Sequence, residues 1–316
     1  MVALVLAMAL LAAACGDSDE ESTGTPSGEG PAELRVAYVP ATTALPVHVA
    51  KAQGYFEAKN LDVTLTEAAN ISDLPATLGR QFDLAMGTAT DLIRAGAAGI
   101  DVVQVAGNTV STKDNPFVQV IVPPDKGIDD VADLAGKTIG TPTLSGVIHA
   151  GVLYQAKEQG VDPAQIKAVE APSPNLPDQL KAGRVDAVEA LEPFASQLKK
   201  DGNVSIGDPF SAIADPLATN FWVADGSWAR TNRDVTERFV EAMNQAKDFI
   251  AQNGSEARRV LQGYTGMPEP VAATVPLPTY EFQVRTGDLD KWVDVLKEIG
   301  QFDGKVDTDN LVVSSS

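Results

Sequence analysis

The chain has 316 residues, more than one hydrophobic core usually organises, which favours two packed units. Its 24 basic and 43 acidic residues give a formal net charge of −19, which argues against a surface built to bind nucleic-acid phosphates. Hydrophobic residues make up 44% of the chain, enough to form a globular body.

The chain begins with an uncharged apolar segment, residues 1–14, which we interpret as the hydrophobic part of a signal peptide. It is shorter than the roughly 20 residues that cross a bilayer. No basic segment precedes it, so we expect the true start to lie upstream of Met1. Residues 15–32 are small, polar and acidic, which predicts a flexible tether.

Cys15 is the only cysteine and directly follows three alanines. Small residues before a lone cysteine at this point resemble the bacterial lipoprotein signal, in which the cysteine becomes the lipid-modified N-terminus. The resemblance implies lipid attachment at Cys15. The alternative is an ordinary secretory signal in which the cysteine is incidental.

From Glu33 onward, strand and helix patterns alternate, which predicts a parallel sheet with helices on both faces. The strands are expected at residues 34–39, 62–68, 83–88 and 101–110, and the helices at 44–56, 72–79 and 88–99, with Ser72 as the cap of the second.

A second series follows a segment, residues 117–124, that ends in paired prolines and is interpreted as a crossing between lobes. Residues 215–225 are interpreted as the return crossing, and the remainder is largely helical. After Asn232, an apolar stripe at helical spacing comprises Val235, Phe239, Met243, Ala246 and Ile250. The second series has strands near 137–142, 166–172 and 187–191 and a helix at 145–160, and further helices are expected near 255–264, 268–275 and 287–299.

This order predicts one discontinuous lobe, residues 33–121 and 218–316, with the other lobe, residues 122–217, inserted. A repeat supports two related lobes. "LPATLGRQFDLAMGTAT" begins at Leu74, and "LPDQLKAGRVDAVEALEP" begins 102 residues later at Leu176.

Ligands of open α/β sheets bind beyond the carboxyl ends of the strands. The loops expected there are rich in Thr, Ser and Asn and contain no Lys or Arg. Free N–H groups at helix starts suit a small anion or polar headgroup, although such residues also cap helices in general. The candidate ligand-binding residues in these loops are Thr42, Thr43, Gly87, Thr88, Thr90, Asn108, Thr143, Ser145, Gly146 and Asn220.

Four titratable residues near the expected cleft are also considered. His149 lies one turn after Ser145, where a neutral imidazole either donates to the ligand or is packed, and His48 is placed similarly in the first helix. Glu192 is a candidate ligand contact that favours an amine, whereas Glu189 is expected to be solvated or to cap a helix.

Strand aromatics either stack on a ligand or, more commonly, form core; those concerned are Tyr38, Phe221 and Trp222. Two histidines without nearby cysteines or paired acids do not form a metal site, so no metal, cofactor or catalytic residue is expected.

Several short motifs occur in one order along the chain: Pro46, Ala50 and Gly54-Tyr-Phe56, then Asn60-Leu61-Asp-Val63, "DLAGKTIG" (133–140) and "AGRVDAVEALEP" (182–193). Over residues 33–300 the chain resembles the solute-binding proteins of ATP-driven importers in the nitrate, sulfonate, taurine and thiamine-precursor group. The resemblance implies the two-lobe periplasmic-binding-protein type II fold, with two doubly wound α/β sheets joined by two crossing strands. The chain departs from the family at Leu191 and Glu192, where relatives often have Trp and Asp.

The resemblance further implies a monomeric lipoprotein, held at the outer face of the bacterial cell membrane by its lipid alone. It would capture a small polar organic solute, such as a sulfonate, taurine or nitrate, between its lobes and deliver it to a permease and ATPase. Open alternatives are binding of a thiamine-type aminopyrimidine or small aromatic acid, signalling without transport, and a pyrimidine-synthase-like enzyme. Synthases of this fold use a cysteine-rich iron motif, which a chain with one cysteine does not offer.

Overall fold

The computed structural model describes residues 30–285 and 287–313. From Pro31 onward the chain forms one compact unit. The predicted signal segment, Cys15 and nearly all of the predicted tether lie outside the described residues. Within the described ranges, no helix has the length and apolar character needed to cross a membrane.

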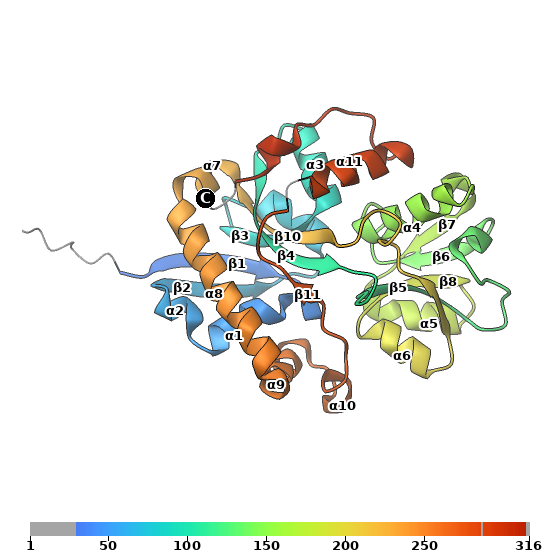
Figure 1. The fold of residues 1–316 in the computed structure, drawn as a ribbon, viewed down its shortest axis with the longest axis horizontal. Helices are drawn as coiled ribbons and strands as arrows, with labels where there is room; N and C mark the ends of the chain where they lie inside the picture. The colour runs from blue at the N-terminus through green and yellow to red at the C-terminus, as the bar shows by residue number, and fades with distance from the viewer. Residues whose placement is uncertain (1–29, 286, 314–316) are drawn as a thin grey trace, which may run out of the picture. The chain divides into compact units, whose positions relative to one another are not determined.

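The first sheet has six strands in the order β11-β4-β10-β3-β1-β2 (Figure 1). Strands β1, β2 and β3 are parallel, but β10 lies antiparallel between β3 and β4, and β11 is antiparallel to β4. The expectation of a purely parallel sheet is therefore wrong, because the returning chain inserts a strand of opposite direction. The strands are β1 (Ala32–Tyr38), β2 (Leu61–Glu67), β3 (Leu84–Thr88), β4 (Val102–Ser111), β10 (Leu217–Asp225) and β11 (Thr279–Tyr280).

The second sheet has five strands in the order β7-β6-β8-β5-β9. They are β5 (Val118–Val122), β6 (Thr138–Thr141), β7 (Lys167–Glu170), β8 (Ala187–Leu191) and β9 (Val204–Gly207).

The two segments interpreted as crossings, residues 117–124 and 215–225, contain strands β5 and β10 of the sheets. β5 pairs with β8 and β9, and β10 pairs with β3 and β4. The paired prolines follow β5 and end it, so they do not exclude the strand before them. The predicted lobe boundary between residues 121 and 122 falls inside β5, and the chain passes between the sheets at residues 112–117 and 208–216.

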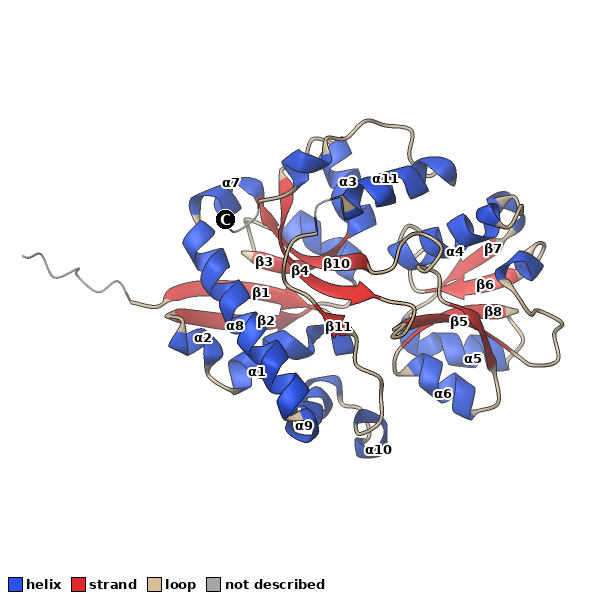
Figure 2. Cartoon of the chain, in the orientation of Figure 1, coloured by secondary structure: helices blue, strands red, loops and turns tan. Residues whose placement is uncertain are grey.

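Helices cover both faces of the first sheet (Figure 2). On one face α8 packs on α1 and α2, and on the other α11 packs on α3. The helices of the first series and the C-terminal part are α1 (Leu45–Ala52), α2 (Tyr55–Ala58), α3 (Ala89–Ala97), α7 (Gly226–Thr231), α8 (Arg233–Gln252), α9 (Gly254–Thr265), α10 (Glu269–Ala272) and α11 (Asp288–Glu298). Those of the second series are α4 (Val147–Glu158), α5 (Leu176–Lys181) and α6 (Phe194–Lys200). Short 3-10 turns are η1 (Thr42–Ala44), η2 (Ile71–Thr77), η3 (Val131–Leu134), η4 (Pro163–Gln165), η5 (Ser173–Asn175) and η6 (Thr308–Leu311).

Two predicted helices differ in detail. The helix expected at residues 44–56 is broken at Gly54, whose φ of 73° ends α1 and starts α2. The segment at 72–79 is the 3-10 turn η2, and its cap is Asn70, whose side chain accepts from the backbone N–H of Ser72, so the expected cap at Ser72 is wrong. All five members of the apolar stripe of α8 are buried, as predicted.

The sequence repeat is a repeat of structure. The order β2-β1-β3 in the first sheet matches β7-β6-β8 in the second. Val36 of β1 aligns with Leu84, and Ile139 of β6 aligns with Ala187, so each pair is separated by 48 residues.

The two repeats share an aspartate that directly precedes a strand, Asp83 before β3 and Asp186 before β8. Asp83 Oδ2 accepts a hydrogen bond from the Arg35 backbone N–H (2.8 Å), and Asp186 Oδ2 accepts one from the Thr138 N–H (3.0 Å). Each carboxylate satisfies the N–H of the neighbouring parallel strand and so fixes the register of two strands. The repeats therefore place the loops after β1 and β6 at corresponding positions.

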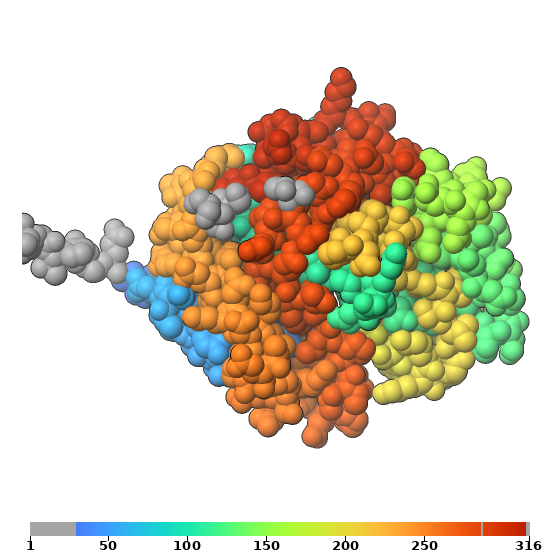
Figure 3. Space-filling view, viewed as in Figure 1, coloured from blue at the N-terminus to red at the C-terminus, as the bar shows by residue number. Residues whose placement is uncertain are grey.

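The hydrophobic core is continuous between the sheets at α4. Val147 and Ala150, in the first turn of this helix, belong to the core cluster of the first sheet. Ile299, just after α11, packs against the core clusters of both sheets. Figure 3 shows the red segment of α11 against the yellow-green segment of α4.

We expect Asp83→Ala and Asp186→Ala each to lower the free energy of unfolding by about 1–3 kcal/mol, because each leaves a strand N–H without its charged acceptor. Urea unfolding measures the change. Asp201→Ala removes an exposed carboxylate as the control and is expected to change stability by less than about 0.5 kcal/mol. Equal stability of Asp186→Ala and the control would contradict the register role.

Candidate functional site

Asn220 organises the polar end of the first sheet. In β10 it aligns with Thr88 of β3 and Thr109 of β4. Its Oδ1 accepts from Asn108 Nδ2 (3.1 Å) and Thr109 Oγ1 (2.9 Å), and Asn108 Nδ2 also donates to the Thr43 carbonyl (3.2 Å). Four predicted residues, Thr43, Thr88, Asn108 and Asn220, are thus brought together. Asn108 Oδ1 is buried, and no described group donates to it.

Thr88 and Thr90 belong to a second network at the start of α3. Thr88 caps the helix and donates through Oγ1 to Asp91 Oδ2 (2.7 Å), while Thr90 Oγ1 lies 3.2 Å from Thr88 Oγ1. Ser72 donates to the same Asp91 oxygen. Burial raises the pKa of Asp91, and the hydrogen bonds from Thr88 and Ser72 offset part of this increase. Thr90 is completely buried.

The second sheet contributes a buried charged pair. His149 Nδ1 lies 2.7 Å from Glu189 Oε1, and Thr141 Oγ1 donates to Glu189 Oε2 (2.5 Å). The Glu189 side chain is 0% exposed, so the expectation of a solvated or capping residue is wrong. Strand β8 is buried on both faces, which removes the alternation that would have shown this orientation.

The charge of His149 follows from its partner. Burial alone lowers the pKa of His149, but the charge of Glu189 and the hydrogen bond to it raise it by more, so the pKa lies above the ordinary value of 6.5. The raised pKa favours the protonated ring, which pairs with the carboxylate of Glu189.

Glu192 is buried at the start of α6, 3% exposed. Its Oε2 accepts from the Ser196 backbone N–H (3.1 Å), which is a favourable position for a carboxylate at a helix start. Its Oε1 is also buried, and within the described ranges it has no hydrogen-bond donor.

The remaining predicted residues lie around these clusters. Thr42 is buried, Thr143 is half-buried, and Ser145 is exposed before α4. Gly87 is a packing glycine, because a Cβ there would lie 2.8 Å from Val223, and Gly146 lies close to Thr143. Phe221 and Trp222 are core residues rather than stacking surfaces.

Arg94 joins the two halves and was missed from the sequence. From α3 it donates to the Ser145 carbonyl of the β6–α4 loop and to Gln301 Oε1 (3.2 Å). The loops expected to bind ligand contain no Lys or Arg. Arg94 lies one helical turn after Thr90 in α3, and its guanidinium contacts one of these loops at Ser145. Because the Ser145 carbonyl accepts this hydrogen bond from Arg94, the polar ends of the two repeats are in contact here.

Three aromatic side chains position the β1–α1 loop. Tyr264 donates to the Ala41 carbonyl and Tyr280 to the Thr42 carbonyl, each at 2.7 Å. His48 stacks on Tyr264 with ring centroids 3.8 Å apart. The tyrosines lie more than 220 residues from the loop, so no local sequence pattern indicates these contacts.

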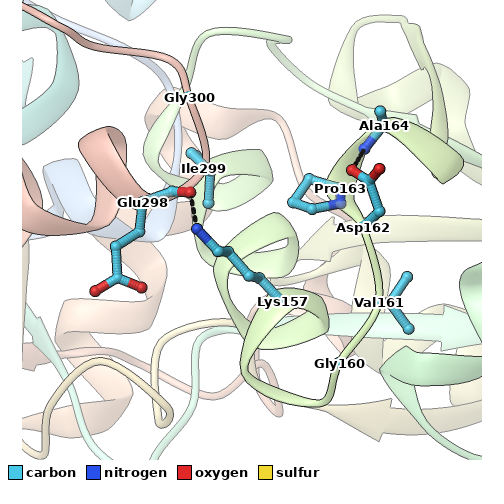
Figure 4. Close-up of a pocket in the computed structure, with 9 residues that line it drawn as sticks. All are labelled: Lys157, Gly160, Val161, Asp162, Pro163, Ala164, Glu298, Ile299 and Gly300. Carbon is cyan, nitrogen blue, oxygen red and sulfur yellow. Dashed lines mark hydrogen bonds between the residues drawn. The ribbon is translucent and has the colours of Figure 1, made fainter.

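Two cavities are described. One of about 460 Å³ lies between the ends of α4 and α11, where Lys157 Nζ donates to the Glu298 carbonyl (Figure 4). The other, about 70 Å³, lies between Pro193, Ser196, Gln197 and Lys200 on the α6 side and Val271, Thr274 and Val275 on the α10 side. None of the predicted ligand residues lines either cavity, but the smaller one borders the helix start that holds Glu192.

Comparison with known proteins identifies the family. The NMT1/THI5-like family matches residues 41–257. The chain belongs to this family.

The NMT1/THI5-like chain has relatives of different activities. It is 26% identical over 228 residues to a 4-amino-5-hydroxymethyl-2-methylpyrimidine phosphate synthase of Candida albicans, a match that covers 67% of this chain and 65% of the synthase. It is also 26% identical over 127 residues to the taurine-binding periplasmic protein of Escherichia coli, covering 40% of this chain and 39% of that protein. The chain thus spans slightly less than two thirds of the synthase's length.

Solved structures establish the fold as that of periplasmic binding proteins. The alkanesulfonate-binding protein of Xanthomonas axonopodis pv. citri, bound to MOPS, has a TM-score of 0.76 at 20% identity and covers 91% of this chain and 100% of its own. The nitrate-binding protein of Synechocystis has a TM-score of 0.65 at 13% identity, covering 90% of this chain and 92% of its own. The predicted fold class is confirmed.

We expect Thr88→Ala to lower the free energy of unfolding by about 1 kcal/mol, because it removes the cap of α3. Ser145→Ala is expected to change it by less than about 0.5 kcal/mol, because Arg94 binds the backbone carbonyl of Ser145 and not its side chain. Chemical unfolding of the two variants side by side measures the difference. A Ser145→Ala variant as unstable as Thr88→Ala would show that the Ser145 hydroxyl has a structural role.

We expect His48→Phe to reduce the loss of stability in acid. Burial lowers the pKa of His48 from 6.5 to about 4, so the unfolded chain binds a proton there more strongly than the folded one, and stability falls as the pH drops from 6.5 toward 4. Phe keeps the stacking on Tyr264 but does not titrate. Between pH 7 and 5, the native protein should lose about 2 kcal/mol more than His48→Phe, measured by urea unfolding at both pH values. An equal loss in both proteins would place His48 in a solvated environment.

Proposed function

We propose that the protein is an extracytoplasmic solute receptor of an ATP-driven importer, which captures a small polar organic solute and delivers it to a permease. The observation that carries this proposal is the meeting of the polar strand ends of the two repeats at the bridge from Arg94 to Ser145. The polar groups of Asn108 and Asn220 lie on one side of this boundary and those of His149 and Glu192 on the other. Ligand would shift the two halves toward a closed arrangement.

The leading solute class is sulfonates, including taurine, with nitrate-like anions next. The relatives named for taurine and alkanesulfonates support this class. The buried acceptor of Glu192 favours a solute that also carries an amine, because a buried carboxylate oxygen without a donor is costly. We therefore rank an aminosulfonate above a plain anion.

A thiamine-type aminopyrimidine is the alternative solute, supported by the pyrimidine synthases among the relatives. An amino group on such a ring would also satisfy Glu192. We infer binding without catalysis, because the chain has a single cysteine, Cys15, where a cysteine-rich iron motif would need several. The proposal includes a lipid anchor at Cys15 on the outer face of the bacterial cell membrane and a monomeric receptor without nucleic-acid partners.

A thermal-shift panel tests the receptor. The purified protein is mixed with taurine, methanesulfonate, nitrate and 4-amino-5-hydroxymethyl-2-methylpyrimidine. A solute at about 100 times its dissociation constant adds roughly 2.7 kcal/mol of stability and raises the melting midpoint by a few degrees. A panel in which no compound moves the midpoint would overturn the receptor function.

Glu192→Gln tests the amine contact. We expect it to weaken taurine binding about tenfold or more, while methanesulfonate, which lacks the amine, binds as before. Glu158→Gln removes the same charge from the exposed end of α4 and serves as the control. If Glu192→Gln weakens both compounds equally, Glu192 acts through the fold and not through the amine.

A further inference from the structure

The buried pair of His149 and Glu189 leaves one polar atom available. Glu189 uses one oxygen for His149 Nδ1 and the other for Thr141 Oγ1, so the carboxylate is satisfied. A protonated imidazole donates through both ring nitrogens, and at His149 the Nδ1 atom faces Glu189. In the part of the chain that the structure describes, Nε2 of His149 has no hydrogen-bond partner, and it is not among the buried unpaired atoms, so it is open to solvent although the side chain as a whole is 6% exposed.

The pair lies where the two sheets meet. His149 is in the first turn of α4, between Val147 and Ala150, which pack into the core of the first sheet. The loop directly before this turn holds the Ser145 carbonyl that Arg94 contacts from the other half. The available Nε2–H is therefore near the boundary between the halves and not at the far end of the second sheet.

The charges around His149 come from few elements. Glu189 on β8 is the group in contact with it, and Arg94 on α3 approaches the preceding loop. Glu170 at the end of β7 accepts from the Leu144 N–H in the same loop. The acids near α4 from α11, which are Asp294 and Glu298, act together with Glu158 on Tyr154, five residues further along the helix.

We propose that protonated His149 binds the negatively charged group of the solute through Nε2–H, and that Glu189 is the positioning residue that holds the ring and its charge. This rests on the proposed receptor function and deepens it, because with Glu192 it defines the solute as a zwitterion with an amine and an acidic group. The loops carry no Lys or Arg, so this imidazolium supplies the positive charge from within the helix. The buried carboxylate of Glu189 would be unfavourable without a cation beside it. The pair with His149 is therefore expected to remain when no solute is bound.

The proposal predicts the direction of a pH dependence. A sulfonate should bind while His149 is protonated and be released as the pH rises above about 6.5 through the raised pKa of His149. Removing the charge of Glu189 should move this release to lower pH, since the remaining effect of burial lowers the pKa of His149.

Imidazole NMR tests this directly, since the chain contains two histidines and His48→Phe assigns the other. Methanesulfonate and taurine, at millimolar concentration, are titrated into the native full-length protein, Glu189→Gln, His149→Gln and the control Glu158→Gln, from about pH 6 to pH 9. Glu189→Gln is nearly isosteric, and its melting midpoint and backbone spectrum establish that it is folded.

In the native protein and in Glu158→Gln we expect both compounds to shift the Nε2 signal of His149, with affinity falling at least tenfold across this range. In Glu189→Gln the fall should occur at lower pH, and in His149→Gln the pH dependence should be absent. A His149 signal that responds to neither compound overturns the inference. If another compound of the panel still stabilises the protein in that case, the receptor function stands and only the anion contact is wrong; if none does, both are wrong.

Discussion

The antiparallel pairing of β10 with β3 and β4 is the constraint on which the arrangement depends. The chain leaves the first sheet after β4 and must return to it, and it returns as a strand inserted between its own earlier strands. The two connections lie side by side, since the Lys113 backbone N–H of one donates to Asp215 Oδ1 of the other (3.2 Å). The inserted strand β10 also places Asn220 beside Thr88 and Asn108. The same strand therefore connects the halves and forms the polar end of the first sheet.

The two repeats contribute different polar side chains to the boundary between the halves. Each repeat ends a strand at the shared boundary, held by an aspartate that binds the N–H of its neighbour. The first half supplies mainly amides and hydroxyls, and the second supplies the charged groups His149, Glu189 and Glu192. The charged residues of the first half are Asp91, which accepts from Thr88 and Ser72, and Arg94, which donates to the Ser145 carbonyl of the second half. The halves are thus complementary rather than equivalent, although their strand orders match.

Much of this architecture is readable from the sequence because local periodicity determines it. The βα alternation, the stripe on α8 and the 102-residue repeat all reflect contacts between near neighbours or one shared structural unit. The errors arise where long-range pairing decides. β5 and β10 are buried on both faces, so they show no alternation, and only their partners reveal them as strands. The roles of Glu189 and Tyr280 likewise depend on partners 40 and 238 residues away.

The polar groups at the boundary between the halves differ from those that a catalytic site needs. A catalytic site needs groups that exchange protons or electrons with the substrate, whereas both oxygens of Glu189 are taken by His149 and Thr141, and His149 has one donor left. Half-buried Asp91, at the start of α3, likewise accepts from Thr88 and Ser72. These groups are arranged to hold fixed charges and dipoles in place. Fixed charges of both signs at one boundary match the zwitterionic solute of the receptor that we propose, and a solute that pairs with both would stabilise the closed arrangement.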